Sequence, residues 1–276
     1  MADFNQKLIC ILTDFGLKGQ HYVASMKAVI LKINSNIRII DLSNQITPYS
    51  VIEASYILKN TYKLFPKGTV FIIVVDPGVG SSREILALKT YSDHYFIGPN
   101  NGIFSINLTD DIKECIEIQN DEFFNKPISK TFHGRDIMAP IGAHLLSGIP
   151  LNRFGSNFNL NNLKESPINY DIEIKKKTIK CLIQYIDSFG NGTTNIPMVN
   201  NKIQNSELIL SEGTKIRITI KGNTYEGLFA SHFQKVQLKS ILFIVGSTGF
   251  LEISVNQGNA SKKLGFIVGD AVTLEL

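Results

Sequence analysis

A continuous apolar run, TVFIIVV at Thr69–Val75, constrains the fold of this chain more than any other segment. It consists of β-branched and aromatic residues and lacks the alternation of apolar and polar positions that a half-exposed strand shows. Such a run is typical of a strand that is buried on both faces of a parallel sheet. The run therefore predicts a sheet that is covered by helices on both sides.

The neighbouring segments indicate the order strand, helix, strand. Leu8–Thr13 and Ile37–Asp41 are strand-like, whereas Gln20–Asn34 and Tyr49–Phe65 carry apolar residues at helical spacing. Three further strands and a helix are predicted at residues 84–89, 94–97, 112–118 and 135–146. Because strands and helices alternate in this way, we predict an N-terminal α/β domain over residues 1–160 with a mostly parallel sheet.

The second half of the chain has a different pattern. Residues 152–167 are polar and rich in asparagine, and we interpret them as a linker. Beyond them we expect strands alone, separated by glycine-containing turns, which is typical of a small antiparallel barrel. The predicted strands are residues 170–175, 178–186, 215–220, 224–229, 241–245, 251–255 and 271–276. We therefore predict a C-terminal antiparallel β-barrel-like domain over residues 168–276.

Composition narrows the possible partners and the location. The net charge is only +4, and the basic run Lys175–Lys177 is not interleaved with aromatic residues, so no nucleic-acid partner is expected. The first residues lack the pattern of a secretory signal, and no apolar run reaches the ~18 residues of a membrane span. The three cysteines lie in strand-like segments, which indicates buried thiols in a reducing compartment. We expect a cytoplasmic protein without a membrane partner.

Polar residues gather where the predicted strands end, at the edge where open parallel sheets bind ligands. Asp14 follows the first strand and could accept two hydrogen bonds from a ribose diol, although a turn aspartate would have the same spacing. Asp76 and Arg83 bracket the segment DPGVGSSR, which indicates either a site or a glycine turn with a salt bridge. His133 precedes a helix, and its alternative is a surface loop histidine.

The second half holds one comparable loop, YIDSFGNGTTN at residues 185–195. Asp187 suits an ammonium group, Phe189 a base ring, and Asn191 an amide or the edge of an adenine. A β-hairpin turn is the alternative interpretation of this loop.

Several widespread motifs are absent from the sequence, namely GxxxxGK[ST], GxGxxG after a strand, HExxH and GxSxG. A metal site would have to combine Asp14, Asp76 and His133. Arg83 argues against that combination, because a guanidinium near Asp76 repels a cation. We therefore expect neither a metal nor another cofactor.

Eight segments, taken in order, resemble the S-adenosylmethionine hydroxide adenosyltransferase family, which is homologous to the S-adenosylmethionine-dependent chlorinases and fluorinase. They are LTDFG, YVASMKAVI, DLSNQITPYSVIEASYIL, FPKGTVFIIVVDPGVGSSR, FIGPNNGIFS, TFHGRDIMAPIGAHL, YIDSFGNGTTNI and GSTGFLEISVNQGNAS, and they span nearly the whole chain. The resemblance implies a homotrimer with ligands at subunit interfaces. It also implies that water or hydroxide attacks C5′ of S-adenosylmethionine, a substrate rather than a cofactor, and releases adenosine and L-methionine.

The resemblance also assigns roles to individual residues. It implies that Asp76, Arg83 and His133 are the catalytic set, that Asp14 holds the ribose hydroxyls, and that Asp187 faces the methionine ammonium. The other substrate-binding residues that it implies are Phe189, Asn191, Phe233, Asn259 and Ala260 on the adenine side and Ser247 at the methionine carboxylate.

The sequence also departs from the halogenases of this group. Gly134 stands where the fluorinase has a serine in its halide pocket, and the long fluorinase insertion between Leu58 and Asp76 is missing, so water is favoured over halide. Thr248 replaces an arginine that contacts the methionine carboxylate in the halogenases. We hypothesise that His133 and Arg83 bind the attacking water and that Asp76 orients one of them.

Three alternatives remain beside this interpretation. A non-catalytic adenosine- or S-adenosylmethionine-binding protein would keep the pocket without turnover. A halide-using transferase would form a 5′-halogenated product. A metal-dependent nucleotide hydrolase would lose its activity when a chelator is added.

Overall fold

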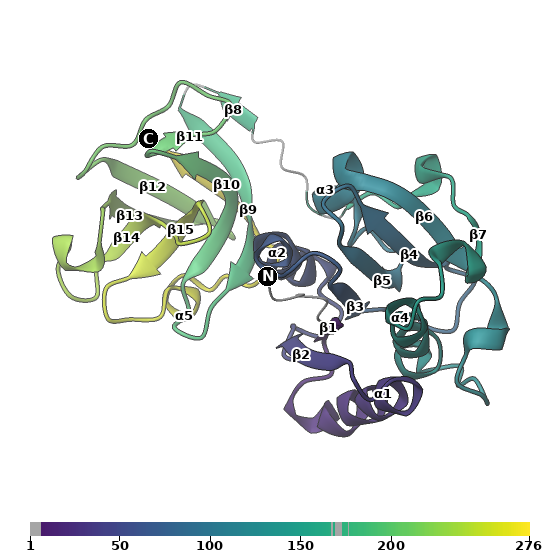
Figure 1. Ribbon diagram of the computed structural model, residues 1–276. Helices are drawn as coiled ribbons and strands as arrows, with labels where there is room; N and C mark the ends of the chain where they lie inside the picture. The colour runs from purple at the N-terminus through teal and green to yellow at the C-terminus, as the bar shows by residue number, and fades with distance from the viewer. Residues whose placement is uncertain (1–6, 167, 169–172, 176) are drawn as a thin grey trace, which may run out of the picture. The chain divides into compact units, whose positions relative to one another are not determined.

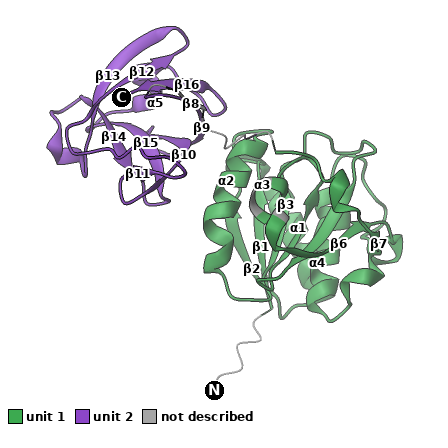
Figure 2. Ribbon diagram, turned by 90° about the horizontal axis from the view of Figure 1, so that it is seen from above, with its two compact units in different colours: residues 1–167 green, residues 168–276 purple. Residues whose placement is uncertain are grey.

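The chain folds into two compact units, residues 1–167 and residues 168–276 (Figure 2). The structure is a computed structural model, and it describes residues 7–166, 168, 173–175 and 177–276 (Figure 1). Each unit buries its own apolar residues, so each has a hydrophobic core that is independent of the other unit.

Unit 1 contains a seven-stranded sheet. Its strands are β1 (Leu8–Thr13), β2 (Arg38–Ser43), β3 (Val70–Val74), β4 (Ile85–Thr90), β5 (Tyr95–Pro99), β6 (Ile112–Ile118) and β7 (Gly155–Asn157). They are arranged in the order β2-β1-β3-β5-β4-β6-β7, in which the first four run parallel and the others pair antiparallel. The predicted α/β class is confirmed, and β3, from the TVFIIVV run, is buried along its whole length.

Helices cover both faces of this sheet. Met26 and Ile30 of α1 (Gln20–Ile33) share one core with α4 (Ala139–Leu146), and α2 (Val51–Thr61) belongs to the core on the other face. Alternate residues of β1 enter the two cores, because successive side chains of a strand point to opposite faces. Since β1 and β3 run parallel, their carboxyl ends lie side by side. Asp14 follows β1 directly, and Asp76 follows β3 after Val75.

Short helical segments complete unit 1. They are α3 (Ser105–Leu108), a π-helical turn η5 (Gly134–Met138), and the 3-10 turns η1 (Leu17–Gly19), η2 (Tyr62–Leu64), η3 (Thr109–Asp111), η4 (Asp121–Phe123), η6 (Leu151–Arg153) and η7 (Leu160–Asn162). The interpretation of residues 152–167 as a linker is wrong for β7, which pairs with β6 at the edge of the sheet. Backbone hydrogen bonds to β6 hold β7 in the sheet, and Phe154, directly before β7, is buried in the core.

Unit 2 is a β-barrel. Its elements are β8 (Glu173–Lys175), β9 (Thr178–Ile186), β10 (Gly192–Val199), β11 (Lys202–Ile203), β12 (Lys215–Ile220), β13 (Asn223–Phe229), η8 (Phe233–Lys235), β14 (Ile241–Val245), β15 (Phe250–Val255), α5 (Ala260–Leu264) and β16 (Ala271–Glu275). The order β10-β15-β14-β13-β12-β16-β9 closes where β9 pairs with β10. The predicted barrel is confirmed; β13 and β14 pair parallel, and the other pairs of the ring are antiparallel.

Two predicted segments of unit 2 differ from the observed elements or lie partly outside the described residues. Residues 170–172 of the predicted strand 170–175 lie outside the described residues, and residues 173–175 form β8. The loop predicted at residues 185–195 is wrong from Gly192 onward, because these residues begin β10. Their polar side chains are buried and bonded to neighbouring strands: Thr194 Oγ1 donates to the Leu251 carbonyl at 2.7 Å, and Asn195 Oδ1 accepts from Leu182 N at 2.9 Å.

Two further expectations concern the burial of the cysteines and the presence of membrane-spanning helices. All three cysteines are free and buried, as predicted from their apolar surroundings. Within the described ranges, none of the helices combines the length and the hydropathy of a membrane span.

Candidate active site

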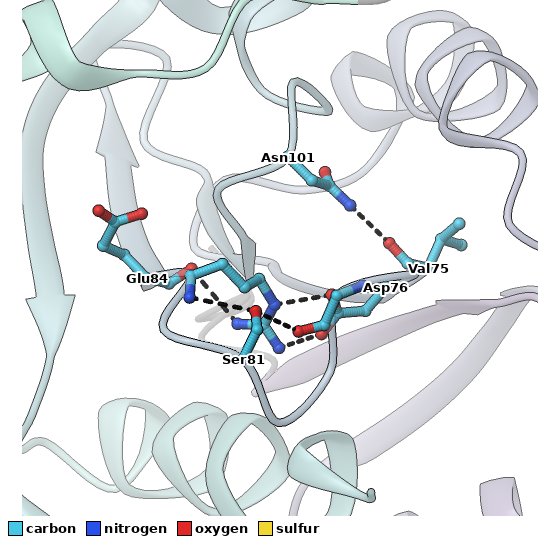
Figure 3. A network of polar contacts seen from close by, with 7 residues as sticks. Val75, Asp76, Ser81, Glu84 and Asn101 are labelled. Atoms are coloured by element: carbon cyan, nitrogen blue, oxygen red, sulfur yellow. Dashed lines mark hydrogen bonds and ion pairs between the residues drawn. The ribbon is translucent and has the colours of Figure 1, made fainter.

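Asp76 and Arg83 form a buried ion pair at the carboxyl end of β3 (Figure 3). Arg83 Nε donates to Asp76 Oδ1 at 2.7 Å, and Arg83 Nη2 donates to Asp76 Oδ2. The Gly78 amide also donates to Asp76 Oδ1, at 3.1 Å. The Asp76 side chain is 4% exposed and the Arg83 side chain 11%. This bidentate geometry fixes the plane of the guanidinium, so Asp76 orients Arg83.

The segment between the two residues is held in one shape by backbone contacts. Gly80 adopts φ +80°, and a Cβ added there would overlap the Lys130 carbonyl, so this turn requires glycine. Ser81 Oγ donates to the Gly78 carbonyl at 2.7 Å and accepts from Arg83 N at 3.3 Å. From the next loop, Asn101 Nδ2 donates to the Val75 carbonyl at 2.8 Å (Figure 3). The loop thus restricts where the arginine can point.

His133 lies just before the π-helical turn and lines the same cavity as Asp76. Its Nδ1 is buried and has no hydrogen-bond partner within the part of the chain that the structure describes. Burial lowers the pKa of His133, the positive charge of Arg83 lowers it further, and the carboxylates of Asp76 and Asp136 oppose this shift. A charged imidazolium would need a partner for its Nδ1–H, so the site favours the neutral ring.

A second buried carboxylate holds the segment that carries His133. Asp136 is fully buried and accepts from Arg135 Nε at 2.7 Å, from Asn125 Nδ2 at 2.9 Å and from Ser129 N at 2.8 Å. These bonds tie the preceding loop to the helical turn. They therefore fix the backbone on both sides of His133.

Asp14 completes the polar groups of this cavity. Its Oδ2 accepts a hydrogen bond from Tyr49 N at 2.8 Å. Burial raises the pKa of Asp14, bonds from the amides of Tyr49 and of Asp14 itself oppose the shift, and the charge of Asp76 adds to it. The cavity has a volume of 340 Å³, and Asp14, Asp76 and His133 line it together with the aromatic side chains of Phe15, Tyr49 and Phe132. An apolar wall with three convergent polar groups is typical of a small-molecule site.

Unit 2 has a separate cavity of 580 Å³ that Asp187, Phe189, Asn191 and Phe233 line. Asp187 organises its own loop: Oδ1 accepts from the Phe189 and Asn191 amides at 2.9 and 2.8 Å, and Oδ2 accepts from Asn191 Nδ2 at 2.9 Å. The residues Phe189 and Phe233 are 74% and 37% exposed, so they offer open apolar surface at this cavity. Such surface suits a planar aromatic ligand group.

Three residues that the resemblance implied are not among those that line this cavity. Ser247 is exposed in the turn between β14 and β15, Asn259 caps α5 by accepting from Lys262 N at 2.7 Å, and Ala260 is buried in the barrel core. The wall is instead completed by residues that the sequence analysis did not single out: Glu252, Val255, Gln257 and Gly258. Glu252 had a detectable signal, because it is an acid within the otherwise apolar strand FLEISV.

Gly134 packs against the end of β3, so a larger residue at this position should destabilise the protein. A Cβ added there would lie 2.8 Å from Val74 Cγ1 and 3.1 Å from Val74 Cγ2, a stiff β-branched side chain. We expect Gly134→Ser to lower the free energy of unfolding by about 1–3 kcal/mol, measured by denaturant titration. Gly78→Ala is the control, since its Cβ would meet Ser81 Oγ at 3.4 Å, an ordinary contact. Equal stability of the Gly134→Ser variant and the wild type would contradict this account of the packing.

Comparison with known proteins gives a consistent result for both units. Residues 9–155 match the SAM hydroxide adenosyltransferase N-terminal domain, and residues 181–273 match the corresponding C-terminal domain. A protein of Methanocaldococcus jannaschii named (R)-S-adenosyl-L-methionine hydrolase is 34% identical over 273 residues, which cover 96% of this chain and 94% of that protein. A fluorinase of Nocardia brasiliensis is 25% identical over 78% of each chain. The crystal structure of an uncharacterized conserved protein from Thermotoga maritima aligns with a TM-score of 0.85 and 36% identity, and covers 97% of this chain and 100% of that one.

Proposed function

The chain belongs to the SAM hydroxide adenosyltransferase family, and we propose that this enzyme hydrolyses S-adenosyl-L-methionine to adenosine and L-methionine. The observation that carries the proposal is the cavity of unit 1, where Asp14, His133 and the Arg83-paired Asp76 converge. Fluorinases match with lower identity than the hydrolases, which supports water rather than halide as the nucleophile.

The reaction needs help at the nucleophile rather than at the leaving group. When the C5′–S bond breaks, the sulfonium leaves as a neutral thioether and takes the bonding electron pair, so no general acid is required. The attacking water has a pKa of about 15.7 in bulk, and it must lose its proton as the C5′–O bond forms. We propose that the imidazole of His133 accepts this proton. Burial favours the neutral ring, which is the form that can accept it.

Arg83 and Asp14 have supporting roles in this proposal. Arg83 is not among the residues that line the cavity, but Asp76, which pairs with it, is. We propose that the positive charge of Arg83, fixed by Asp76, stabilises hydroxide character on a water that lies in line with the C5′–S bond. Asp14 binds the ribose hydroxyls and so positions C5′. Asp76 acts as a positioning residue, because both of its oxygens accept from Arg83.

We also propose that the enzyme is a cytoplasmic homotrimer with sites at subunit interfaces and that it needs no metal or other cofactor. The trimer follows the family resemblance and the location follows the sequence composition. Sedimentation of the purified protein would test the trimer. Support for the second part is the engagement of Asp76 by Arg83, since a carboxylate paired in this way is a poor metal ligand.

A product assay tests the reaction itself. The purified protein is incubated with S-adenosylmethionine with and without chloride and a chelator, and the products are separated by chromatography. We expect adenosine and L-methionine in equal amounts, at a rate that neither addition changes. A 5′-chlorinated nucleoside would indicate a halide transferase, loss of activity with chelator a metal enzyme, and bound but intact substrate a binding protein.

A further inference from the structure

We propose that Asn100 and Asn101, two adjacent residues in the loop after β5, are positioning residues that hold both ends of the segment carrying Asp76 and Arg83. This inference rests on the proposed function, since it assigns the placement of the ion pair to side chains outside the cavity wall. Neither asparagine is among the residues that line the cavity of unit 1. Their effect on the reaction must therefore pass through the segment that they hold.

Asn101 holds the end at which this segment leaves β3. Its Nδ2 donates to the Val75 carbonyl at 2.8 Å (Figure 3), and its Oδ1 accepts from the Ile103 amide at 3.3 Å. Val75 is fully buried and directly precedes Asp76. A buried carbonyl needs a donor, and here the donor comes from a side chain of the neighbouring loop. Asn101 thus fixes the backbone from which the Asp76 carboxylate projects.

Asn100 holds the other end, directly before β4. Its backbone amide donates to the Glu84 carbonyl at 2.9 Å, and its Nδ2 donates to Glu84 Oε2 at 3.1 Å. Bonds from the amide of Glu84 itself and from Asn100 lower the pKa of Glu84, so the acceptor is an ionised carboxylate and the bond is charge-assisted. The Glu84 carbonyl also accepts from Arg83 Nη1 at 3.4 Å. The residue that Asn100 holds therefore contacts the guanidinium.

Asn100 is itself rigidly placed. It is 3% exposed, its Oδ1 accepts from the Lys164 amide at 2.9 Å, and its Nδ2 also donates to the Asn162 carbonyl at 3.2 Å. Both polar atoms of this side chain thus bond to residues that are distant in sequence. A buried amide with all of these bonds has a single orientation, so it can serve as a fixed support for Glu84.

These bonds matter for the reaction because the ion pair fixes only its own internal geometry. The place of Asp76 and Arg83 relative to His133 depends on how the ends of their segment are tied to the sheet. His133 is followed by Gly134, which packs against Val74 at the end of β3. A misplacement of about 1 Å in a preorganised site can cost up to about 10²-fold in rate. Loosening either end should therefore lower kcat.

Asparagine-to-aspartate variants test this role, since they are nearly isosteric and remove a donor. Asn101→Asp places an acceptor against the Val75 carbonyl. We expect kcat for adenosine release to fall about 10- to 100-fold and the KM for S-adenosylmethionine to stay within about threefold of the wild type. Asn120→Asp is the matched control, because Asn120 Nδ2 donates to the Arg153 carbonyl at 3.1 Å and its Oδ1 accepts from Glu122 N at 3.2 Å. Asn120 does not line the cavity, and its variant should keep the kcat of the wild type.

Reversing the bond between Asn100 and Glu84 tests the other end. Asn100→Asp sets two carboxylates against each other and should lower kcat in the same way, again with little change in KM. Adding Glu84→Gln places an amide donor opposite the introduced carboxylate and restores the bond in the reverse direction. The double variant should recover most of the lost kcat. Glu84→Gln alone keeps an acceptor oxygen for Asn100 and should remain close to the wild type.

An NMR spectrum of the arginine Nε–H groups reports on the ion pair without turnover. The Arg83 signal, assigned from its absence in Arg83→Lys, should shift in Asn101→Asp and in Asn100→Asp and stay in place in Asn120→Asp. Asn101→Ala removes the donor without adding a charge. It should shift the same signal, which guards against misfolding of one variant.

Other results would overturn the proposal. An unchanged kcat in Asn101→Asp, an unmoved Arg83 signal, or no recovery of kcat in the double variant would mean that the asparagines do not position the ion pair. A fall in kcat that Asn120→Asp shares would indicate a general loss of stability. A wild type that releases no adenosine would refute the proposed function, whereas the Arg83 signal would still decide whether the two asparagines hold the pair.

Discussion

Replacing Arg83 with methionine should destabilise the protein and slow adenosine release, and adding Asp76→Asn should restore stability but not activity. Asp76 is 4% exposed in the wild type, and in the single variant it keeps only the Gly78 amide among its present donors. Removing one partner of a buried ion pair typically costs about 3–5 kcal/mol, because the other charge is left uncompensated. The double variant removes that charge, and urea unfolding should return to within about 1–2 kcal/mol of the wild type.

The kcat should depend on whether the guanidinium of Arg83 is present, and not on the free energy of unfolding. Losing a preorganised donor to a developing oxyanion typically lowers kcat about 10²–10³-fold, and we expect this loss in both the single and the double variant. Arg217→Met is the matched control, since Arg217 is half exposed and pairs with Glu226 and Glu275 at 3.3 Å on the barrel surface. It should change stability by less than about 1 kcal/mol and leave kcat unchanged. Recovery of kcat in the double variant would show that Arg83 has only a structural role.

The Asp76–Arg83 pair also shows what the sequence could and could not predict. Its spacing is compatible with a buried pair at a site, but equally with a glycine turn that carries a surface salt bridge. The choice depends on contacts that are distant in sequence, such as the close approach of Gly80 to the Lys130 carbonyl and the bond from Asn101 to Val75. No local pattern encodes these contacts.

The central strands of unit 1 were easier to predict, because β1 and β3 are continuous apolar runs that are buried along their whole length. β3 is buried on both faces, as its unbroken run of β-branched and aromatic residues indicates. The strands that were missed have the opposite character. β10 contains Gly192, Asn195 and Pro197, and its polar side chains are buried in bonds to neighbouring strands rather than exposed in a turn. Periodicity measures apolar burial, so it does not detect strands that bury satisfied polar groups.

The unit 2 cavity was predicted only in part for a similar reason. The motif YIDSFGN placed Asp187, Phe189 and Asn191 in one loop, and they line one cavity. The opposite wall comes from β15 and the turn after it, and strand pairing between β10 and β15 brings it there. Pairing of strands that are some 60 residues apart is a property of the whole barrel.

Replacing His133 with alanine should lower kcat about 10²–10⁴-fold and leave the KM for S-adenosylmethionine nearly unchanged, because a general base acts on the water rather than on the substrate. His144→Asn is the matched control. Burial lowers the pKa of His144 as well, but this residue of α4 is not among those that line the cavity. Its kcat should equal that of the wild type.

The pH dependence distinguishes a base from a residue that only shapes the cavity. Since burial and Arg83 lower the pKa of His133, its ring is neutral at pH 7, and protonation on the acid side removes the base. The kcat of the wild type should therefore be flat above pH 7 and fall only below the ordinary histidine pKa of about 6.5. Asp14 also gains a proton in acid, from a raised carboxyl pKa, but as a ribose ligand it should affect KM.

In the alanine variant, the acid limb of kcat should disappear, and added imidazole should restore part of the rate. A variant that is slow but keeps the acid limb would place the titrating base elsewhere, and Asp14 would then be the next candidate, as the other acid that lines that cavity. A variant with full kcat would leave Arg83 as the sole activator of the water. Each result separates proton transfer from electrostatic stabilisation, because the charge of Arg83 does not titrate in this range.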